Sequence, residues 1–220
     1  MHVPDCLKRI ARYKNRSRNG SWLAWAVGLG LACCPLAWDS EATPAKTPSI
    51  PTNAPPTVTE VTLRSADPVQ IQGAKAVVLL FVSVECPISN QYAPEFRRLA
   101  RDFDARGVAF RLVYPNRDET VAAVRKHLAE FELPIAAWTD HEHRLVKASG
   151  VHVTPEAAVY VPNQGWAYHG RIDDRHVAFG KVRTEPKKQD LRDALEAILA
   201  NRTPTAPTTP ALGCSIPSLP

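Results

Sequence analysis

The feature that most constrains the fold is an uninterrupted apolar run at residues 76–83, Ala-Val-Val-Leu-Leu-Phe-Val-Ser. A run this short and continuous is typical of a strand buried on both faces of a sheet. Further strands and helices alternate around it, which predicts an α/β sandwich with a central mixed sheet flanked by helices: parallel strands joined by crossovers, then an antiparallel hairpin at one edge. The strands are expected at 58–63, 108–114, 134–138, 157–161 and 166–172, and the helices at 87–105, 118–131, 140–148 and 187–200.

Composition divides the chain into four parts. Within residues 1–38, six basic residues lie between positions 8 and 18, and an uncharged apolar run follows at 21–38. This layout predicts an export signal or an uncleaved N-terminal membrane anchor, and Cys33-Cys34 also resembles a lipoprotein box. Residues 39–57 are predicted to be a Pro-rich linker, 58–200 the folded domain, and 201–220 a Pro-rich C-terminal tail that carries Cys214.

The net charge of +5 lies in the N-terminal part, because the rest of the chain has as many acidic as basic residues. The folded part therefore has no basic stripe for phosphates, and nucleic acid is excluded as a partner. Cys86 and Cys214 are the cysteines of the exported portion, in a compartment where disulfides persist.

The position of Cys86 in the sequence favours a reactive thiolate. Cys86 directly follows the buried strand and begins a helix, with Pro87 at the first helical position. Backbone N–H groups at a helix N-terminus stabilise an anion, and the thiolate is the reactive form of cysteine. The sequence therefore predicts that Cys86 is a nucleophile.

Two segments resemble the thioredoxin superfamily. Residues 86–94, Cys-Pro-Ile-Ser-Asn-Gln-Tyr-Ala-Pro, resemble its active-site helix, and residues 150–156, Gly-Val-His-Val-Thr-Pro-Glu, resemble its loop with a cis proline. The similarity covers residues 58–200 and favours an exported redoxin, TlpA-like or peroxiredoxin-like branch. It implies that Pro155 is cis and faces the sulfur. It also implies that Thr154 pairs with a bound polypeptide, and that Pro87, Ser89, Thr154 and Pro155 line the substrate site.

The departures from this pattern leave several functions open. Ser89 replaces the second cysteine of the superfamily's Cys-x-x-Cys, and Glu85 precedes Cys86. We expect a thiol-disulfide oxidoreductase that acts on protein thiols or disulfides with Cys86, and with Cys214 as the candidate resolving cysteine. The alternative is a thiol peroxidase acting on peroxide, for which Ser83 fits; Arg171 and Arg183 are then the candidates for the arginine that this chemistry needs.

Two further hypotheses give the protein a non-catalytic function. One is a thioredoxin-like binding module, and the other is a copper-handling protein that combines the two cysteines with His152 or His169. No cofactor and no metal are expected for the favoured function, and His141-Glu142-His143 matches no common metal site. Asp173 and Asp174 are expected to face solvent and to pair with Arg171 or Arg175.

Overall fold

The computed structural model describes residues 57–60 and 71–219. The predicted leader at 1–38 and almost all of the predicted linker at 39–57 lie outside these residues. Within the described part, none of the helices combines the length and the apolar character needed to cross a membrane.

The central sheet has six strands in the order β1-β4-β3-β2-β6-β7. The first four run parallel, whereas β6 is antiparallel to β2, and β7 is antiparallel to β6. The strands are β1 (Val58–Glu60), β2 (Ala76–Phe81), β3 (Val108–Tyr114), β4 (Ala137–Thr139), β6 (Glu156–Val161) and β7 (Gly165–Gly170). This is the predicted mixed sheet, with the hairpin at one edge.

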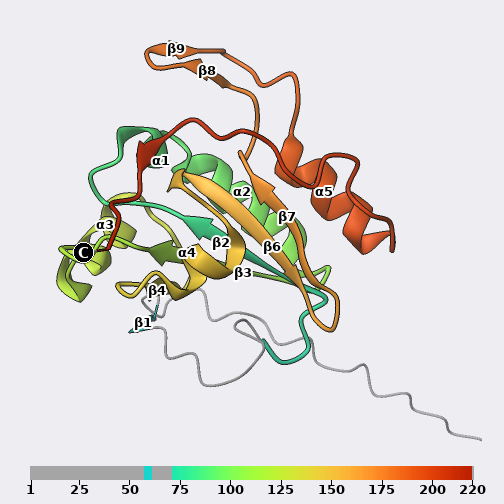
Figure 1. The fold of residues 1–220 in the computed structure, drawn as a ribbon, viewed down its shortest axis with the longest axis horizontal. Coiled ribbons are helices and arrows are strands. Elements are labelled where there is room, and N and C mark those ends of the chain that lie inside the picture. Colours follow the sequence, from blue (N-terminus) through green and yellow to red (C-terminus); the bar gives the residue numbers. More distant parts are fainter. Residues whose placement is uncertain (1–56, 61–70, 220) are drawn as a thin grey trace, which may run out of the picture. The chain divides into compact units, whose positions relative to one another are not determined.

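Helices cover both faces of the sheet, which confirms the predicted sandwich. Alternate residues of β2 enter two separate hydrophobic clusters, as the period of a strand requires. Val78 and Leu80 pack on the side of α1, α2, α3 and α5, whereas Val77 and Leu79 pack on the side of α4; Figure 1 shows α4 and α2 on opposite faces. The helices are α1 (Pro87–Gln91), α2 (Ala93–Asp104), α3 (Val121–Glu130), α4 (Arg144–Ser149) and α5 (Asp190–Leu199).

All four predicted helices differ from the prediction at their ends, and the last of them, expected at 187–200, is α5 at Asp190–Leu199. The helix expected at 87–105 divides at Tyr92, since Pro94 has no N–H and its ring crowds the preceding turn. The third helix begins at Val121 because the Thr120 hydroxyl accepts the amide of Ala123. Asp140 accepts three amides of the first turn of α4, so it caps this helix as expected, although the helix begins only at Arg144.

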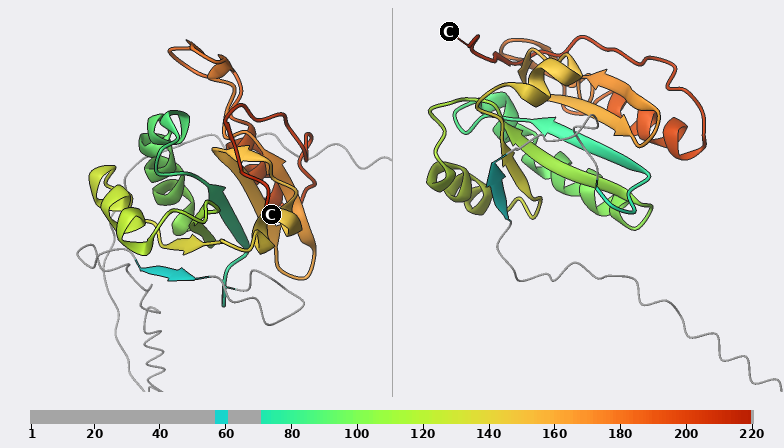
Figure 2. Two further views of the ribbon diagram at one scale, coloured as in Figure 1. Left: turned by 60° about the vertical axis from the view of Figure 1, so that its left-hand side comes forward. Right: turned by 60° about the horizontal axis from the view of Figure 1, so that its bottom comes forward.

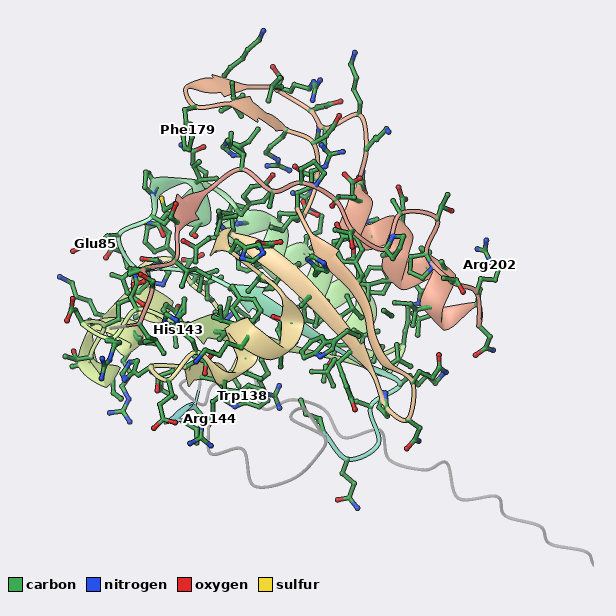
Figure 3. All side chains as sticks on the ribbon, in the orientation of Figure 1. Glu85, Trp138, His143, Arg144, Phe179 and Arg202 are labelled. Carbon is green, nitrogen blue, oxygen red and sulfur yellow. The ribbon has the colours of Figure 1, made fainter. Side chains whose placement is uncertain are left out.

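Two short two-stranded sheets were not expected from the sequence. Strands β8 (His176–Ala178) and β9 (Lys181–Val182) form a hairpin that projects from the rest of the domain (Figures 1 and 2). Its Phe179 is 71% exposed (Figure 3). The second sheet joins β5 (Val153–Thr154) to β10 (Cys214–Ser215) in the tail.

The Pro-rich tail packs along β7 before it reaches β5. The amide of His169 donates to the carbonyl of Pro207, and the amide of Thr209 donates to the carbonyl of His169. The buried Thr209 hydroxyl is bonded to the hydroxyl of Tyr168 and accepts the amide of Arg171. From this anchor the chain continues to β10, beside α1 (Figure 1). The tail is thus attached to the domain at two places.

Candidate active site

The two cysteines meet at the carboxyl end of β2. Cys86 is the N-cap residue of α1, and Cys214 is the first residue of β10. Their sulfur atoms lie 2.8 Å apart, with the Cys214 thiol as donor, and both are free thiols. The two cysteines are 128 positions apart in the sequence, so the fold closes the chain between them into a loop.

The loop before β6 borders the same sulfur. The Thr154–Pro155 peptide bond is cis, as the resemblance implied. When protonated, the Cys86 thiol donates to the carbonyl oxygen of Thr154 over 3.0 Å. Strand β10 pairs antiparallel with β5, which places Cys214 opposite Thr154, and the Thr154 hydroxyl lies 3.5 Å from the carbonyl oxygen of Cys214. The polypeptide paired with Thr154 is thus the chain's own tail.

The two thiols differ in acidity. Burial opposes the ionisation of Cys86, but hydrogen bonds from the Cys214 thiol and from the side chain and amide of Ser89 outweigh it, so the pKa of Cys86 lies below its ordinary value. Cys214 changes in the opposite direction: burial and the neighbouring Cys86 sulfur raise the pKa of its thiol to about 11. Cys86 is therefore the more acidic thiol of the pair, and Cys214 holds its proton more tightly.

The residues around Cys86 divide into buried and exposed ones. The Ser89 hydroxyl is buried and has no other partner among the described residues, so it can donate its hydrogen bond to the Cys86 sulfur. Pro87 begins α1 and is exposed. The exposed Glu85 side chain points away from the domain (Figure 3), so water and salt screen its charge from the thiolate.

A buried carboxylate supports the loop before Cys86. One oxygen of Glu119 accepts the Ser83 hydroxyl and the Val84 amide, both at 2.7 Å, and Asn116 donates to the Ser83 hydroxyl at 2.9 Å. Neither Glu119 nor Asn116 was among the site residues expected from the sequence. Their place in the chain could have indicated them. They follow β3, and the carboxyl end of β3 lies next to the carboxyl end of the parallel strand β2.

A second chain of hydrogen bonds holds the same loop from α3. Asn90 donates to the carbonyl of Val84, and its side-chain oxygen lies 2.8 Å from Nε2 of His127. Nδ1 of His127 lies 2.9 Å from the hydroxyl of Tyr114. Burial lowers the pKa of His127, so we assign the neutral ring, with Nε2–H donating to Asn90 and Nδ1 accepting from Tyr114.

The buried carboxyl group of Glu119 predicts a pH effect on stability. Burial raises its pKa, so between the unfolded value of about 4.3 and the raised folded value the native state binds more protons than the unfolded state. The free energy of unfolding contributed by this group therefore falls as the pH rises through that interval. Glu119→Gln should be more stable relative to wild type at neutral pH than at pH about 4, measured by urea unfolding. Asp118→Asn, an exposed carboxylate of the same loop, is the control; an equal difference at both pH values for Glu119→Gln would contradict this account.

The prediction for Asp173 and Asp174 is wrong for the ion pair of Asp174, which is with Arg183, and for the exposure of both residues. Both are buried rather than solvent-facing. Asp173 does pair with Arg175, as expected, but it also accepts the hydroxyl of Tyr92 at 2.6 Å, which fixes the junction between α1 and α2. Asp174 accepts two backbone amides of the segment before α5, and burial is tolerated because these bonds replace water.

The residues named for the alternative functions have other partners. Arg171 pairs with Asp190 at 2.8 Å, and Arg183 with Asp174 at 3.0 Å. His169 lies 3.6 Å from Glu156 and 3.2 Å from the Thr208 hydroxyl. Within residues 57–60 and 71–219, no three His, Cys, Asp or Glu side chains are arranged to hold a metal ion.

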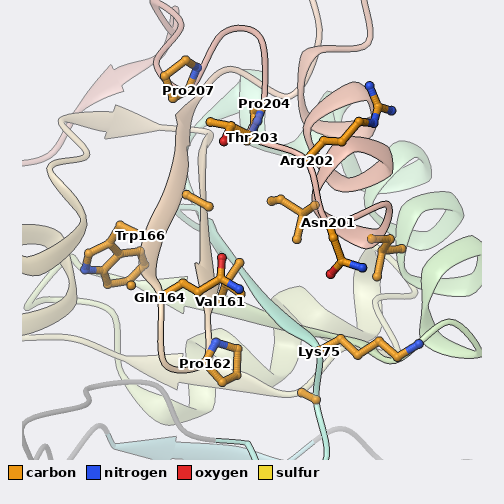
Figure 4. A pocket seen from close by; sticks show the side chains of 15 residues that line it. Lys75, Val161, Pro162, Gln164, Trp166, Asn201, Arg202, Thr203, Pro204 and Pro207 are labelled. Carbon is orange, nitrogen blue, oxygen red and sulfur yellow. The ribbon is translucent and has the colours of Figure 1, made fainter.

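Two cavities lie away from the sulfur pair. One of about 610 Å³, shown in Figure 4, lies between the β6–β7 turn and the end of α5, with Trp166 and Asn201 in its lining. The other, of about 460 Å³, lies beside Glu85 and Glu119 and is bordered by residues 217–219 of the tail. Cys86 lines neither cavity and is 1% exposed, because the tail strand covers it.

Fold and site together define a thioredoxin-fold protein with two cysteine thiols in contact, a thiol-dependent oxidoreductase by class. The redoxin family model matches residues 50–195, and the chain belongs to the redoxin family. Among curated proteins no sequence matches the chain.

Solved structures give the same fold. An uncharacterised conserved protein from Geobacillus kaustophilus is 26% identical, with a TM-score of 0.57, over 66% of this chain and 78% of its own. A hypothetical protein from Sinorhizobium meliloti is 25% identical, with a TM-score of 0.57, over 66% of this chain and 80% of its own. These likenesses agree with the thioredoxin-like sandwich predicted from the sequence.

Proposed function

We propose that the protein is an exported thiol-disulfide oxidoreductase in which Cys86 is the nucleophile and Cys214 is the resolving cysteine. The observation that carries this proposal is the 2.8 Å separation of the two sulfur atoms at the N-terminus of α1, beside the cis Thr154–Pro155 bond. The substrate class is a polypeptide disulfide, or a dithiol when the reaction runs in reverse. Ser89 and Thr154 border the reacting sulfur, and Pro87 and Pro155 shape the two sides of the site.

The reaction has two exchange steps. The Cys86 thiolate attacks one sulfur of a substrate disulfide, the substrate S–S bond breaks, and the other substrate sulfur leaves as a thiolate. Cys214 loses its proton and attacks the Cys86 sulfur of this mixed disulfide. The second substrate sulfur then leaves as a thiol, and the Cys86–Cys214 disulfide forms. The substrate gains the two electrons that the cysteine pair loses.

The raised pKa of Cys214 suits a resolving cysteine, which reacts only after Cys86 has reacted. Burial is the larger cause of its raised pKa, and the remaining causes are the hydrogen bond to Cys86 and the charge of Cys86. Once Cys86 is bound in a mixed disulfide, its negative charge is gone, and this part of the increase disappears. Cys214 therefore ionises more easily after Cys86 has reacted than before.

Export is proposed from the N-terminal sequence. Its basic residues followed by the uncharged run at 21–38 have the layout of a signal segment or an anchor. A compartment that keeps disulfides oxidised suits a protein whose catalytic state alternates between a dithiol and a disulfide. A peroxidase with the same cysteine pair receives less support, since Arg171 and Arg183 are held in ion pairs with Asp190 and Asp174.

A single-turnover reaction tests the proposed function. The reduced protein is mixed with oxidised insulin, and both products are followed by intact mass under non-reducing conditions. We expect insulin thiols and the Cys86–Cys214 disulfide to form together, the latter as a loss of two hydrogens from the protein. The control is Cys214→Ser, which should stop at a mixed disulfide with insulin. A wild-type protein that reduces insulin no faster than free N-acetylcysteine would contradict the proposal.

A further inference from the structure

The tail strand β10 is bound as a substrate polypeptide would be. Cys214 lies opposite Thr154, Ser215 lies opposite Val153, and the amide of Ile216 donates to the carbonyl of His152 over 3.0 Å. This antiparallel pairing brings the Cys214 sulfur to 2.8 Å from Cys86. A cysteine in any extended polypeptide that pairs with β5 in this register would reach the same position, since backbone bonds set the register.

The residue before the cysteine meets the tightest part of this site. Gly213 is buried, and a Cβ atom added to it would overlap the carbonyl oxygen of Thr154 and lie 2.7 Å from the carbonyl carbon. It would also lie 3.2 Å from the nitrogen of Pro155. These neighbours are backbone atoms of the loop that holds the cis bond, so they cannot turn aside as a side chain can. Only glycine fits without a shift of one of the two strands.

Other tail positions are less demanding. Ser215 is exposed, so the site does not restrict which residue occupies this position. Ile216 packs against the hydrophobic cluster of Leu145 and Val151, where an apolar residue is favoured. The separate anchor at Pro207 and Thr209 holds the tail near the site, so the strand can leave β5 while Cys214 stays close.

We propose that residues 213–216 occupy the substrate-binding site as a pseudosubstrate that belongs to the same chain. The site then selects polypeptides with a glycine directly before the reacting cysteine and an apolar residue two positions after it. This inference rests on the proposed function and names its substrate class. Because the tail covers Cys86, which is 1% exposed, a partner strand must displace the tail before its own cysteine can react. The tail and the partner therefore compete for one edge of β5.

Peptide disulfides test the selection directly. Three peptides, Leu-Gly-Cys-Ser-Ile, Leu-Ala-Cys-Ser-Ile and Leu-Gly-Cys-Ser-Asn, carry thionitrobenzoate on their cysteine, and full-length Cys214→Ser is the enzyme. The rate of Cys86→Ser, Cys214→Ser, which keeps Cys6, Cys33 and Cys34, is subtracted. The Cys86 thiolate attacks the peptide sulfur, the peptide–thionitrobenzoate bond breaks, and coloured thionitrobenzoate leaves. The tail competes equally with all three peptides, so their relative rates report the site. We expect the alanine peptide to react about tenfold more slowly than the glycine peptide, and the asparagine peptide about threefold more slowly.

The same substitution in the tail should have the opposite effect. Gly213→Ala, combined with Cys214→Ser, weakens the tail strand and should raise the rate for the glycine peptide by up to about tenfold, because a larger fraction of the protein is open. Ser215→Ala in the Cys214→Ser background is the matched control and should leave the rate unchanged. This reversal between tail and peptide is expected only if both bind at one site.

The outcomes separate this inference from the proposed function. Equal rates for the glycine and alanine peptides, both well above that of N-acetylcysteine, would overturn the selection and leave the oxidoreductase intact. An unchanged rate in the Gly213→Ala variant would overturn the competition between tail and substrate. Rates no higher than that of N-acetylcysteine for every peptide would overturn the proposed function itself, and the selection with it.

Discussion

Cys86→Ser is expected to lower the rate of disulfide exchange at neutral pH by about a hundredfold or more, even though Cys214 is intact. Serine is not ionised near neutral pH, so the nucleophile is lost. Cys214 is a poor replacement because burial, the larger cause of its raised pKa, persists in the variant. The measurement is insulin reduction by the reduced variant at neutral pH, compared with wild type.

The complementary variant serves as the control for this prediction. Cys214→Ser keeps Cys86 and should perform the first step, so its mixed disulfide accumulates instead of being resolved. The double variant Cys86→Ser, Cys214→Ser keeps only the N-terminal Cys6, Cys33 and Cys34, so any mixed disulfide that it forms gives the background. If Cys86→Ser retained more than about a tenth of the wild-type rate, the nucleophile would have to be reassigned to Cys214.

The sheet and its helices could be predicted because each element carries a local signal. The apolar run at 76–83 indicates a strand buried on both faces, and the alternation of strands and helices after it determines the parallel crossovers. The ends were less predictable, because they depend on contacts with other segments. Glu119 is an example: it bonds to Ser83 and Val84, so residues 115–119 remain a loop where a helix was expected from 118.

The candidate site was predictable where its residues belong to motifs. Cys86 and the Thr154–Pro155 loop lie in segments that resemble the thioredoxin superfamily, and the structure brings them within 3.0 Å. The strand at Cys214 was not predictable, since it is two residues long and lies in a Pro-rich segment that favours no strand. Its pairing depends on β5, which is 60 residues away, and on a glycine whose fit is visible only against Thr154.

The burial of Asp173 has a similar reason. Adjacent acidic residues near Arg171 and Arg175 favour a solvent-facing interpretation, because ionised carboxylates are rarely buried without partners. The partners here are Tyr92, 81 residues earlier, and Arg175, which together satisfy the carboxylate. A hydrogen bond across such a separation leaves no pattern in the local sequence. The burial of Asp173 therefore depends on contacts that only the folded chain makes.

Gly170, the last residue of β7, lies against Thr209 of the tail, and its replacement should have the second large effect. Its φ of 147° is open to glycine and strained for other residues. A Cβ there would overlap the hydroxyl and carbonyl oxygens of Thr209 and lie 2.8 Å from the Thr209 nitrogen. Gly170→Ala should therefore lower the free energy of unfolding by about 3 kcal/mol and slow formation of the Cys86–Cys214 disulfide.

Gly180→Ala is the control for a positive φ without a steric clash. Gly180 also has a positive φ, 73°, but nothing lies within 4 Å of an added Cβ, so this variant should lose only about 1 kcal/mol. Urea unfolding gives both free energies, and intact mass after diamide oxidation gives the rate of disulfide formation. If Gly170→Ala matched Gly180→Ala in stability and formed the disulfide at the wild-type rate, the anchor at Thr209 would not be what holds Cys214 beside Cys86. We expect the cysteine pair to depend on that anchor because β10, the strand at Cys214, is only two residues long.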